Sequence, residues 1–247
     1  MRCIKLFMLQ LTYDFHIHTC LSPCADDDMT PTNIVMMAAL KGLDVIAITD
    51  HNTCKNCKAS IEIGKKNDIL VLPGMELTTS EEVHVICLFA DLEDAMRFDT
   101  YVYERLIKVK NKENIFGNQI VVDEDEKEID REEYLLINAT TIGFSEVYEV
   151  VKAYHGVMIP AHIDKNSNSV ISNLGFLPPD SRFSCVELSK LENKECLLDS
   201  NPYLSQCRVI SDSDAHSLGQ INEPIHVLLA KRKSASEVLN ALKGLEP

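Results

Sequence analysis

The sequence has no tryptophan, only 6% aromatic residues, and no apolar run near the roughly 18 residues that a membrane span requires. Basic residues are also scarce: 24 lysines and arginines stand against 38 aspartates and glutamates, a net charge of −14 with histidine neutral. Such an acidic field repels a phosphate backbone, and few aromatic side chains are available to stack bases. We therefore expect neither a membrane partner nor a long nucleic acid wrapped in a basic groove.

We expect no secretion signal at the start of the sequence. The apolar opening MRCIKLFMLQL runs directly into DFHIHT without a small-residue cleavage site, and we predict that it belongs to a first strand. Nine cysteines without a signal indicate a reducing compartment, so the cytoplasm is the expected location. Five of them lie among apolar neighbours and are expected to pack as small hydrophobic side chains: Cys3, Cys87, Cys185, Cys196 and Cys207.

Short apolar runs alternate with helical patterns along the chain, which is typical of βα units around a parallel sheet or barrel. Strands are expected over residues 11–18, 43–49, 69–77, 82–90, 157–164, 183–189, 207–214 and 225–231. Helices are expected from Thr30 and Pro31 to Gly42, over 55–66, 93–109 and 145–156, and from Ser234 onward. No break in composition divides the chain, so we predict one domain over residues 1–247, with an acidic surface excursion at about 110–140.

Histidines gather at the ends of the predicted strands. Six of the eight stand beside another potential ligand or at the edge of an apolar run: His16, His18, His51, His84, His162 and His216. Side chains on a strand alternate between its faces, so His16 and His18 project the same way, as do Asp214 and His216. Glu76 ends a further run, and the carboxyl ends of barrel strands meet at one mouth. Imidazoles and carboxylates suit zinc, iron or manganese, and so many ligands predict two or three ions that share a carboxylate.

DFHIHT, ITDHN, PGMEL, His84, PAHID and SDAHSLG occur in this order over residues 14–219. This series resembles the motifs of the PHP (polymerase and histidinol phosphatase) family. The resemblance implies an α/β fold, a distorted (β/α)7 TIM-like barrel, whose two or three divalent ions (Zn, Fe or Mn) serve phosphoester hydrolysis. One position departs from the pattern, because Pro23 stands where the family usually has an aspartate. The insertion CLSPC shifts that ligand to Asp26, with Asp27 and Asp28 as rivals.

The family layout also implies a division of the ligands. His16, His18 and Glu76 would hold one ion, Glu76 would bridge to a second near His51, His84 and Asp214, and His162, His216 or Asp26 would complete a third. Ions bound in this way lower the pKa of bound water and offset the charge of a phosphoryl group. The expected reaction is therefore attack by a metal-activated hydroxide.

Several neighbouring residues have two possible roles. Asp214 is a ligand alone or, in addition, the catalytic acceptor of the water's proton. Asp50, Asp164 and Asp212 either orient the ligand histidines or are exposed to solvent. Lys165 is either a phosphate contact or a surface lysine. His155 and His226 have no partner pattern and are not expected to be ligands.

Four cysteines come in pairs near the predicted ligands. Cys20 and Cys24 follow the first strand, and Cys54 and Cys57 form a CKNC pair just after His51. If the first two strands are neighbours, both pairs leave the same rim of the barrel. A C-x3-C and C-x2-C set suits a structural zinc ion or an iron–sulfur cluster. Free thiols in two loops and a redox disulfide within CKNC are the alternatives.

These features predict a metal-dependent phosphoesterase for a small phosphomonoester or nucleotide. The resemblance allows histidinol phosphate, a nucleoside bisphosphate or an oligonucleotide end as the substrate. A proofreading module is not expected, because the barrel is not accompanied by a polymerase-sized extension. The alternatives are an exonuclease-type phosphodiesterase of 3′–5′ or 5′–3′ polarity, a non-catalytic metal or iron–sulfur carrier for a redox partner, and a hydrolase of a non-phosphate ester or amide. The complete set of predicted ligands argues against the carrier.

Overall fold

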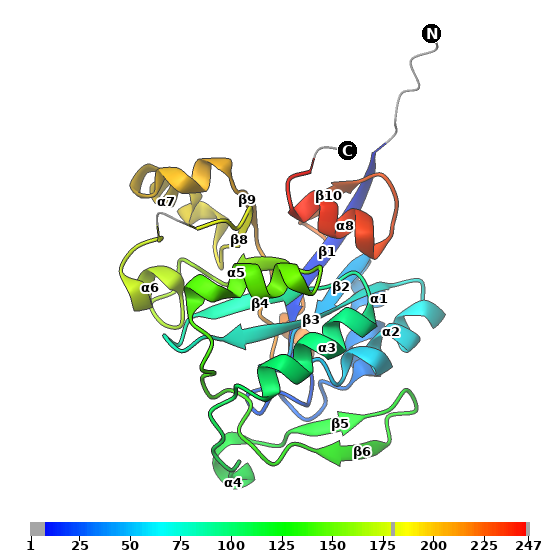
Figure 1. The fold of residues 1–247 in the computed structure, drawn as a ribbon. Coiled ribbons are helices and arrows are strands. Elements are labelled where there is room, and N and C mark those ends of the chain that lie inside the picture. The colour runs from blue at the N-terminus through cyan, green and yellow to red at the C-terminus, as the bar shows by residue number, and fades with distance from the viewer. Residues whose placement is uncertain (1–7, 179–180, 246–247) are drawn as a thin grey trace.

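The computed structural model describes residues 8–178 and 181–245 (Figure 1). The predicted first strand is present as β1 (Leu9–Ile17). Residues 1–7, which were expected to belong to it, lie outside the described residues, and so does Cys3. No helix in the described part of the chain is long and apolar enough to cross a membrane.

Six strands form one mixed sheet in the order β10-β1-β2-β3-β4-β7. After β1 these are β2 (Val45–Ile48), β3 (Leu70–Thr78), β4 (His84–Leu88), β7 (Val157–Pro160) and β10 (Val227–Ala230). The first three strands run parallel, whereas β4 is antiparallel to β3 and to β7, and β10 is antiparallel to β1. A separate parallel pair, β8 (Cys185–Glu187) and β9 (Arg208–Ile210), lies next to β7, where Ile163 N donates to Glu187 O.

The α/β class is confirmed, but the sheet is mixed and the described strands do not form a closed parallel (β/α)7 barrel. The reason lies between β3 and β4. Only residues 79–83 connect these strands, whereas a parallel neighbour needs a crossover of roughly a dozen residues or more. The short connection forces a hairpin, which brings the first residue of β4 to the same end of the sheet as the last residue of β3.

Helices cover the sheet much as the sequence predicts. They are α1 (Pro31–Lys41), α2 (Cys57–Lys66), α3 (Leu92–Tyr103), α5 (Phe144–Ala153), α6 (Val170–Leu174), α7 (Lys194–Ser200) and α8 (Ala235–Leu242). The predicted signals of α1 are present: the Thr30 side chain accepts from Asn33 N, and Gly42 ends the helix with a left-handed φ of 81°. Helix α3 ends six residues before the predicted boundary, because residues 107–109 pair in extended form with residues 135–139.

The two faces of the sheet bury two different cores. Along β2, Ile46 and Ile48 face the core that includes residues of α1, α2, α3 and α5, whereas Val45 and Ala47 face a second core into which α8 inserts. Figure 1 shows α1, α2 and α3 along one face of the curled sheet. Because both faces are covered, β2 is a continuous apolar run, as the sequence indicated.

Gly64 marks the closest approach of α2 to the sheet. A Cβ added there would lie 2.5 Å from Cγ2 of Val71 and 2.7 Å from the backbone oxygen of Ile69. Although alanine is the better helix former, Gly64→Ala is expected to lower the free energy of unfolding by about 1–3 kcal/mol, because the helix must move away from β3. Urea denaturation measures this loss. Gly219→Ala, which meets open space, is the matched control, and equal stability of the two variants would contradict this packing.

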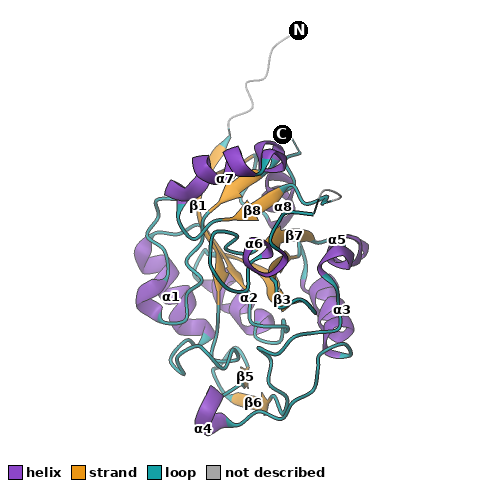
Figure 2. Ribbon diagram, turned by 90° about the vertical axis from the view of Figure 1, so that its left-hand side faces the viewer, coloured by secondary structure: helices purple, strands orange, loops and turns teal. Residues whose placement is uncertain are grey.

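The predicted excursion leaves the sheet at residues 104–143 and contains α4 (Glu113–Phe116), β5 (Ile120–Val122) and β6 (Glu128–Arg131). It lies at the lower end of the molecule in Figures 1 and 2. Two asparagines anchor it: Asn56 donates to Ile120 O (3.1 Å) and accepts from Val122 N (3.0 Å), and Asn52 donates to Leu136 O (2.7 Å). These bonds hold the excursion beside the loop that follows β2.

Candidate metal centre

One stretch of backbone aligns the two predicted i, i+2 pairs. Ala215 N donates to His16 O at 3.1 Å, and His18 N donates to Ala215 O at 3.0 Å. The segment after β9 therefore runs parallel to the end of β1. This pairing brings Asp214 and His216 beside His16 and His18, as the strand periodicity predicted.

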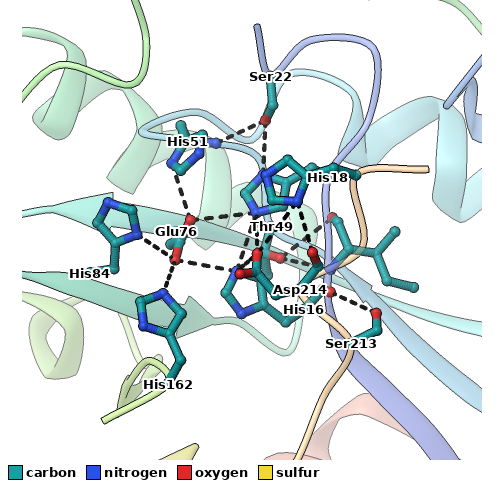
Figure 3. A network of polar contacts seen from close by, with 12 residues as sticks. His16, His18, Ser22, Thr49, His51, Glu76, His84, His162, Ser213 and Asp214 are labelled. Carbon is teal, nitrogen blue, oxygen red and sulfur yellow. Dashed lines mark hydrogen bonds and ion pairs between the residues drawn. The ribbon is translucent and has the colours of Figure 1, made fainter. Parts of the chain in front are cut away.

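Glu76, on β3, lies at the centre of five histidines (Figure 3). The backbone places two of them directly: His51 bridges to Glu76 in parallel, and His84 begins β4 opposite Thr78. Atom Oε1 of Glu76 lies 2.8 Å from His84 Nδ1, 3.2 Å from His162 Nε2 and 3.3 Å from His16 Nε2, and Oε2 lies 3.1 Å from His51 Nδ1 and 3.4 Å from His18 Nε2. Both oxygens of one carboxylate thus face imidazole nitrogens on different sides, which is the geometry of a bridging ligand.

The donor atoms in this cluster fit divalent cations. The Nε2 atoms of His16 and His18 lie 3.2 Å apart, and both face Asp214 Oδ1, at 3.3 and 3.2 Å. The buried atom His162 Nδ1 has no hydrogen-bond partner among the described residues, and His51 Nδ1 faces Glu76 Oε2 at 3.1 Å without the geometry of a hydrogen bond. Hydrogen bonds cannot satisfy so many converging lone pairs, whereas ions that accept them can.

Potential ligand atoms gather in three overlapping groups. One contains His16, His18, Glu76 and Asp214, one contains His51, Glu76 and His84, and one contains His18, His51 and His216. Glu76 belongs to two groups, consistent with the predicted shared carboxylate. Asp214 joins the group of His16 rather than that of His84, unlike the division that the family layout implied. His162 belongs to none of these three groups, and its Nε2 atom faces Glu76 Oε1.

The charges in the cluster depend on one another. Burial alone would raise the pKa of the Glu76 carboxyl, but the surrounding imidazoles, His84 first among them, hold that pKa well below its usual range. Burial likewise opposes ionisation of Asp214, yet His16 and His18 lower its pKa. Burial lowers the pKa of His216 to about 4, with the neighbouring His18 adding to the effect. Two ionised carboxylates amid largely buried imidazoles therefore make the centre attractive to cations.

A cavity of about 320 Å³ opens over the centre. Six predicted ligands line it: His51, Glu76, His84, His162, Asp214 and His216. The remaining wall is formed by Cys24, Ile137 of the excursion, Lys165, Ser167 and Asn168. Lys165 Nζ lies 2.5 Å from Asp214 Oδ2, and this contact places the lysine in the cavity wall rather than on a remote surface.

Asp26 is not part of these groups. Its backbone N donates to His216 O at 2.9 Å, but its side chain is exposed. Its rivals Asp27 and Asp28 are exposed too, and Asp27 accepts hydrogen bonds from Asn118. The described residues therefore give no support to a ligand from this aspartate run, because the CLSPC loop holds all three side chains outside the cluster.

The three neighbouring aspartates behave differently. Asp50 accepts from Ser22 Oγ, which in turn contacts His18 Nδ1 at 3.0 Å, so one hydroxyl connects Asp50 to a predicted ligand histidine. Asp212 accepts from Phe15 N and Asp164 accepts from Ser189 N, and neither contacts a ligand imidazole in the described contacts. His155 and His226 lie apart, the first paired with Asp94 and the second against Tyr13.

Sequence reasoning missed Glu187, at the end of β8. This buried carboxylate contacts His16 Nδ1 at 3.0 Å and accepts from His162 N at 2.6 Å. The available signal was an acidic residue in the apolar run FSCVELS, which resembles the position of Glu76 in PGMEL.

The four paired cysteines do not assemble. No group of potential metal ligands in the described part of the chain contains a cysteine. Cys54 and Cys57 are buried in the core, with both Sγ atoms toward Gly74 O, whereas Cys20 faces Ile120 O of the excursion and Cys24 lines the cavity. Burial also raises the pKa of Cys20 to about 12, which disfavours the thiolate that metals bind. The proposed zinc or iron–sulfur site is therefore not supported, because α2 turns the CKNC pair inward.

Comparisons with known proteins place the site in context. A family model described as the PHP domain matches residues 14–170, more than half of the chain. A 5′-3′ exoribonuclease of Haemophilus influenzae is 30% identical over 82 residues, which are 32% of this chain and 29% of that protein. The chain spans less than half the length of the curated relatives it matches.

Several solved structures share the fold. The lesion-specific endonuclease Q of Pyrococcus furiosus superposes with a TM-score of 0.69 at 18% identity, over 96% of this chain and 57% of that one. An amidohydrolase of Chromobacterium violaceum superposes with a TM-score of 0.58 at 15% identity, over 87% of this chain and 90% of that one.

Proposed function

Because the chain belongs to the PHP domain family of metal-dependent hydrolases, we propose that it hydrolyses a phosphoester of a small phosphorylated substrate, with nucleotides as the chemical class. One observation carries this proposal. The Glu76 carboxylate faces five imidazoles on two sides, at the floor of an open cavity. That donor set suits two or three ions of Zn, Fe or Mn.

Divalent ions bound there lower the pKa of a water ligand towards neutrality and offset phosphoryl charge. His16, His18, Glu76 and Asp214 would hold one ion, and Glu76, His51 and His84 another. Asp214 acts in this proposal as a ligand more than as a general base, because His16 and His18 lower its pKa and so weaken it as a proton acceptor. Lys165, in the cavity wall, supplies a positive charge for a phosphoryl oxygen.

The size and composition of the cavity favour a small substrate. Its volume of about 320 Å³ is near the lower end of the roughly 300–1,000 Å³ of small-molecule sites. Its wall offers one lysine for a phosphate, polar groups at Ser167 and Asn168, and one apolar side chain, Ile137, for a sugar or base. The net charge of −14 disfavours extended contacts with a nucleic-acid backbone.

A second candidate is stepwise removal of nucleotides from an RNA end. It is favoured by the relative from Haemophilus influenzae, which is named a 5′-3′ exoribonuclease. The cavity is open to solvent, so a terminal nucleotide could enter it while the rest of a strand stayed outside.

Analysis of the products formed from a panel of substrates tests the proposal. The panel contains a nucleoside monophosphate, a nucleoside 3′,5′-bisphosphate, a 5′-phosphorylated oligoribonucleotide, a carboxylic ester and an amide, each with Mn²⁺, Fe²⁺ or Zn²⁺. We expect hydrolysis of the nucleotides, and a loss of about 10²–10³-fold in Asp214→Asn. Shortening of the oligoribonucleotide without nucleotide hydrolysis would favour the exoribonuclease, and cleavage of the ester or amide alone would overturn phosphoester chemistry.

A further inference from the structure

Glu187 connects two ligand positions that come from different strands. Its side chain is buried, with 1% exposure. Its Oε1 and Oε2 atoms lie 3.0 and 3.2 Å from His16 Nδ1, and the same Oε2 accepts from the backbone N of His162 at 2.6 Å. One carboxylate therefore contacts the imidazole at the end of β1 and the main chain that carries the histidine after β7.

The main chain at His162 needs such support. His162 has a φ of 31°, in the left-handed region that residues other than glycine rarely adopt. Glu187 holds this turn twice, because its backbone oxygen accepts from Ile163 N at 3.0 Å while its carboxylate accepts from His162 N. The turn directs the His162 imidazole towards Glu76, to which its Nε2 atom lies at 3.2 Å.

The two partners of Glu187 impose the same chemical demand. A backbone N–H is always a donor, so His162 N requires an acceptor. His16 Nε2 faces the cluster, and it can give its lone pair to a cation only if the proton of the neutral ring is on Nδ1, which then also requires an acceptor. A carboxylate accepts from both partners, whereas an amide would place an NH₂ donor against one of them.

We propose that Glu187 is a positioning residue of the centre: its carboxylate fixes the Nδ1–H tautomer of His16 and the left-handed turn at His162 together. This inference rests on the proposed function only in assuming that His16 and His162 serve a metal centre. It predicts that one substitution, at a residue that contacts no ion, weakens metal binding through two ligands at once.

Glu187→Gln tests this role, since the change removes the charge and keeps the shape. We expect Zn²⁺ affinity, measured by competition with a chelating dye, to fall about 10–100-fold while the circular dichroism spectrum is unchanged. Asp99→Asn is the matched control. Asp99 is a buried carboxylate that also accepts two hydrogen bonds, from Thr53 Oγ1 and Cys54 N, but it contacts none of the predicted metal ligands in the described contacts, and its variant should bind Zn²⁺ as the unchanged protein does.

Nitrogen-15 spectra of the histidine rings report the tautomer of His16, which would not change if the role of Glu187 were merely structural. In the unchanged, Zn²⁺-loaded protein we expect the proton of His16 on Nδ1, and in Glu187→Gln a mixture or the Nε2–H tautomer. An Nε2–H ring in the unchanged protein would overturn the proposal without any variant, as would equal Zn²⁺ affinity in Glu187→Gln. Failure of the proposed function is a separate outcome, seen as normal Zn²⁺ binding by the unchanged protein with no phosphoester hydrolysis.

Discussion

Glu76→Gln is expected to bind metal poorly and to lose hydrolysis by about 10³-fold or more in kcat/KM. The glutamate faces His84, His162 and His16 with one oxygen and His51 and His18 with the other. An amide has the same shape, but it lacks the negative charge and presents a donor NH₂ on one side. Neither property suits a ligand between two cations. Metal content by elemental analysis and kcat/KM on the best substrate of the panel measure the two losses.

Glu132→Gln is the control for this substitution. Glu132 is also a buried carboxylate, and it pairs with Lys55 at the excursion instead of with the centre. Its variant should keep the metal content and activity of the unchanged protein. If Glu76→Gln kept both properties as well, the cluster would be a set of hydrogen-bonded side chains and not a metal centre.

The sequence predicted the ligand cluster because strand periodicity records the direction of side chains. His16 and His18, like Asp214 and His216, are two residues apart, and a spacing of two puts side chains on one face of any extended segment. The bridge at Ala215 then brings the two faces together. The spacing thus identifies each pair without knowledge of the strand order, whereas the meeting of the two pairs depends on the fold.

Other features depend on contacts that no local pattern records. Glu187 is the last residue of a short apolar strand, and its partners lie 171 and 25 residues away in the chain. The CKNC spacing is compatible with a metal site, but it says nothing of the direction in which α2 turns the two thiols. The mixed sheet follows from the five-residue connection between β3 and β4, which is within the distance of a hairpin and too short for a parallel crossover.

Removal of bound ions with a chelator is expected to abolish hydrolysis and to lower the melting temperature, and Mn²⁺ or Zn²⁺ should restore both. The melting temperature falls because ions that bind the assembled cluster stabilise the folded state only. The predicted ligands do not meet in the unfolded chain, since they come from β1, β3, β4 and the segments after β2, β7 and β9. At a free ion concentration about 100-fold above Kd, one site contributes about 2.7 kcal/mol.

For a chain of this size that contribution corresponds to a rise of roughly 5–10 °C in the melting temperature. Thermal denaturation followed by fluorescence measures the shift across a titration of Mn²⁺. Glu76→Gln separates binding at the centre from weak binding elsewhere on an acidic protein. The rise in melting temperature with Mn²⁺ should nearly vanish in this variant, whereas ions adsorbed at surface carboxylates would stabilise the variant and the unchanged protein equally. A chelated protein that keeps its melting temperature and its activity would show that the clustered imidazoles need no cation, and the proposed chemistry would then lack its nucleophile.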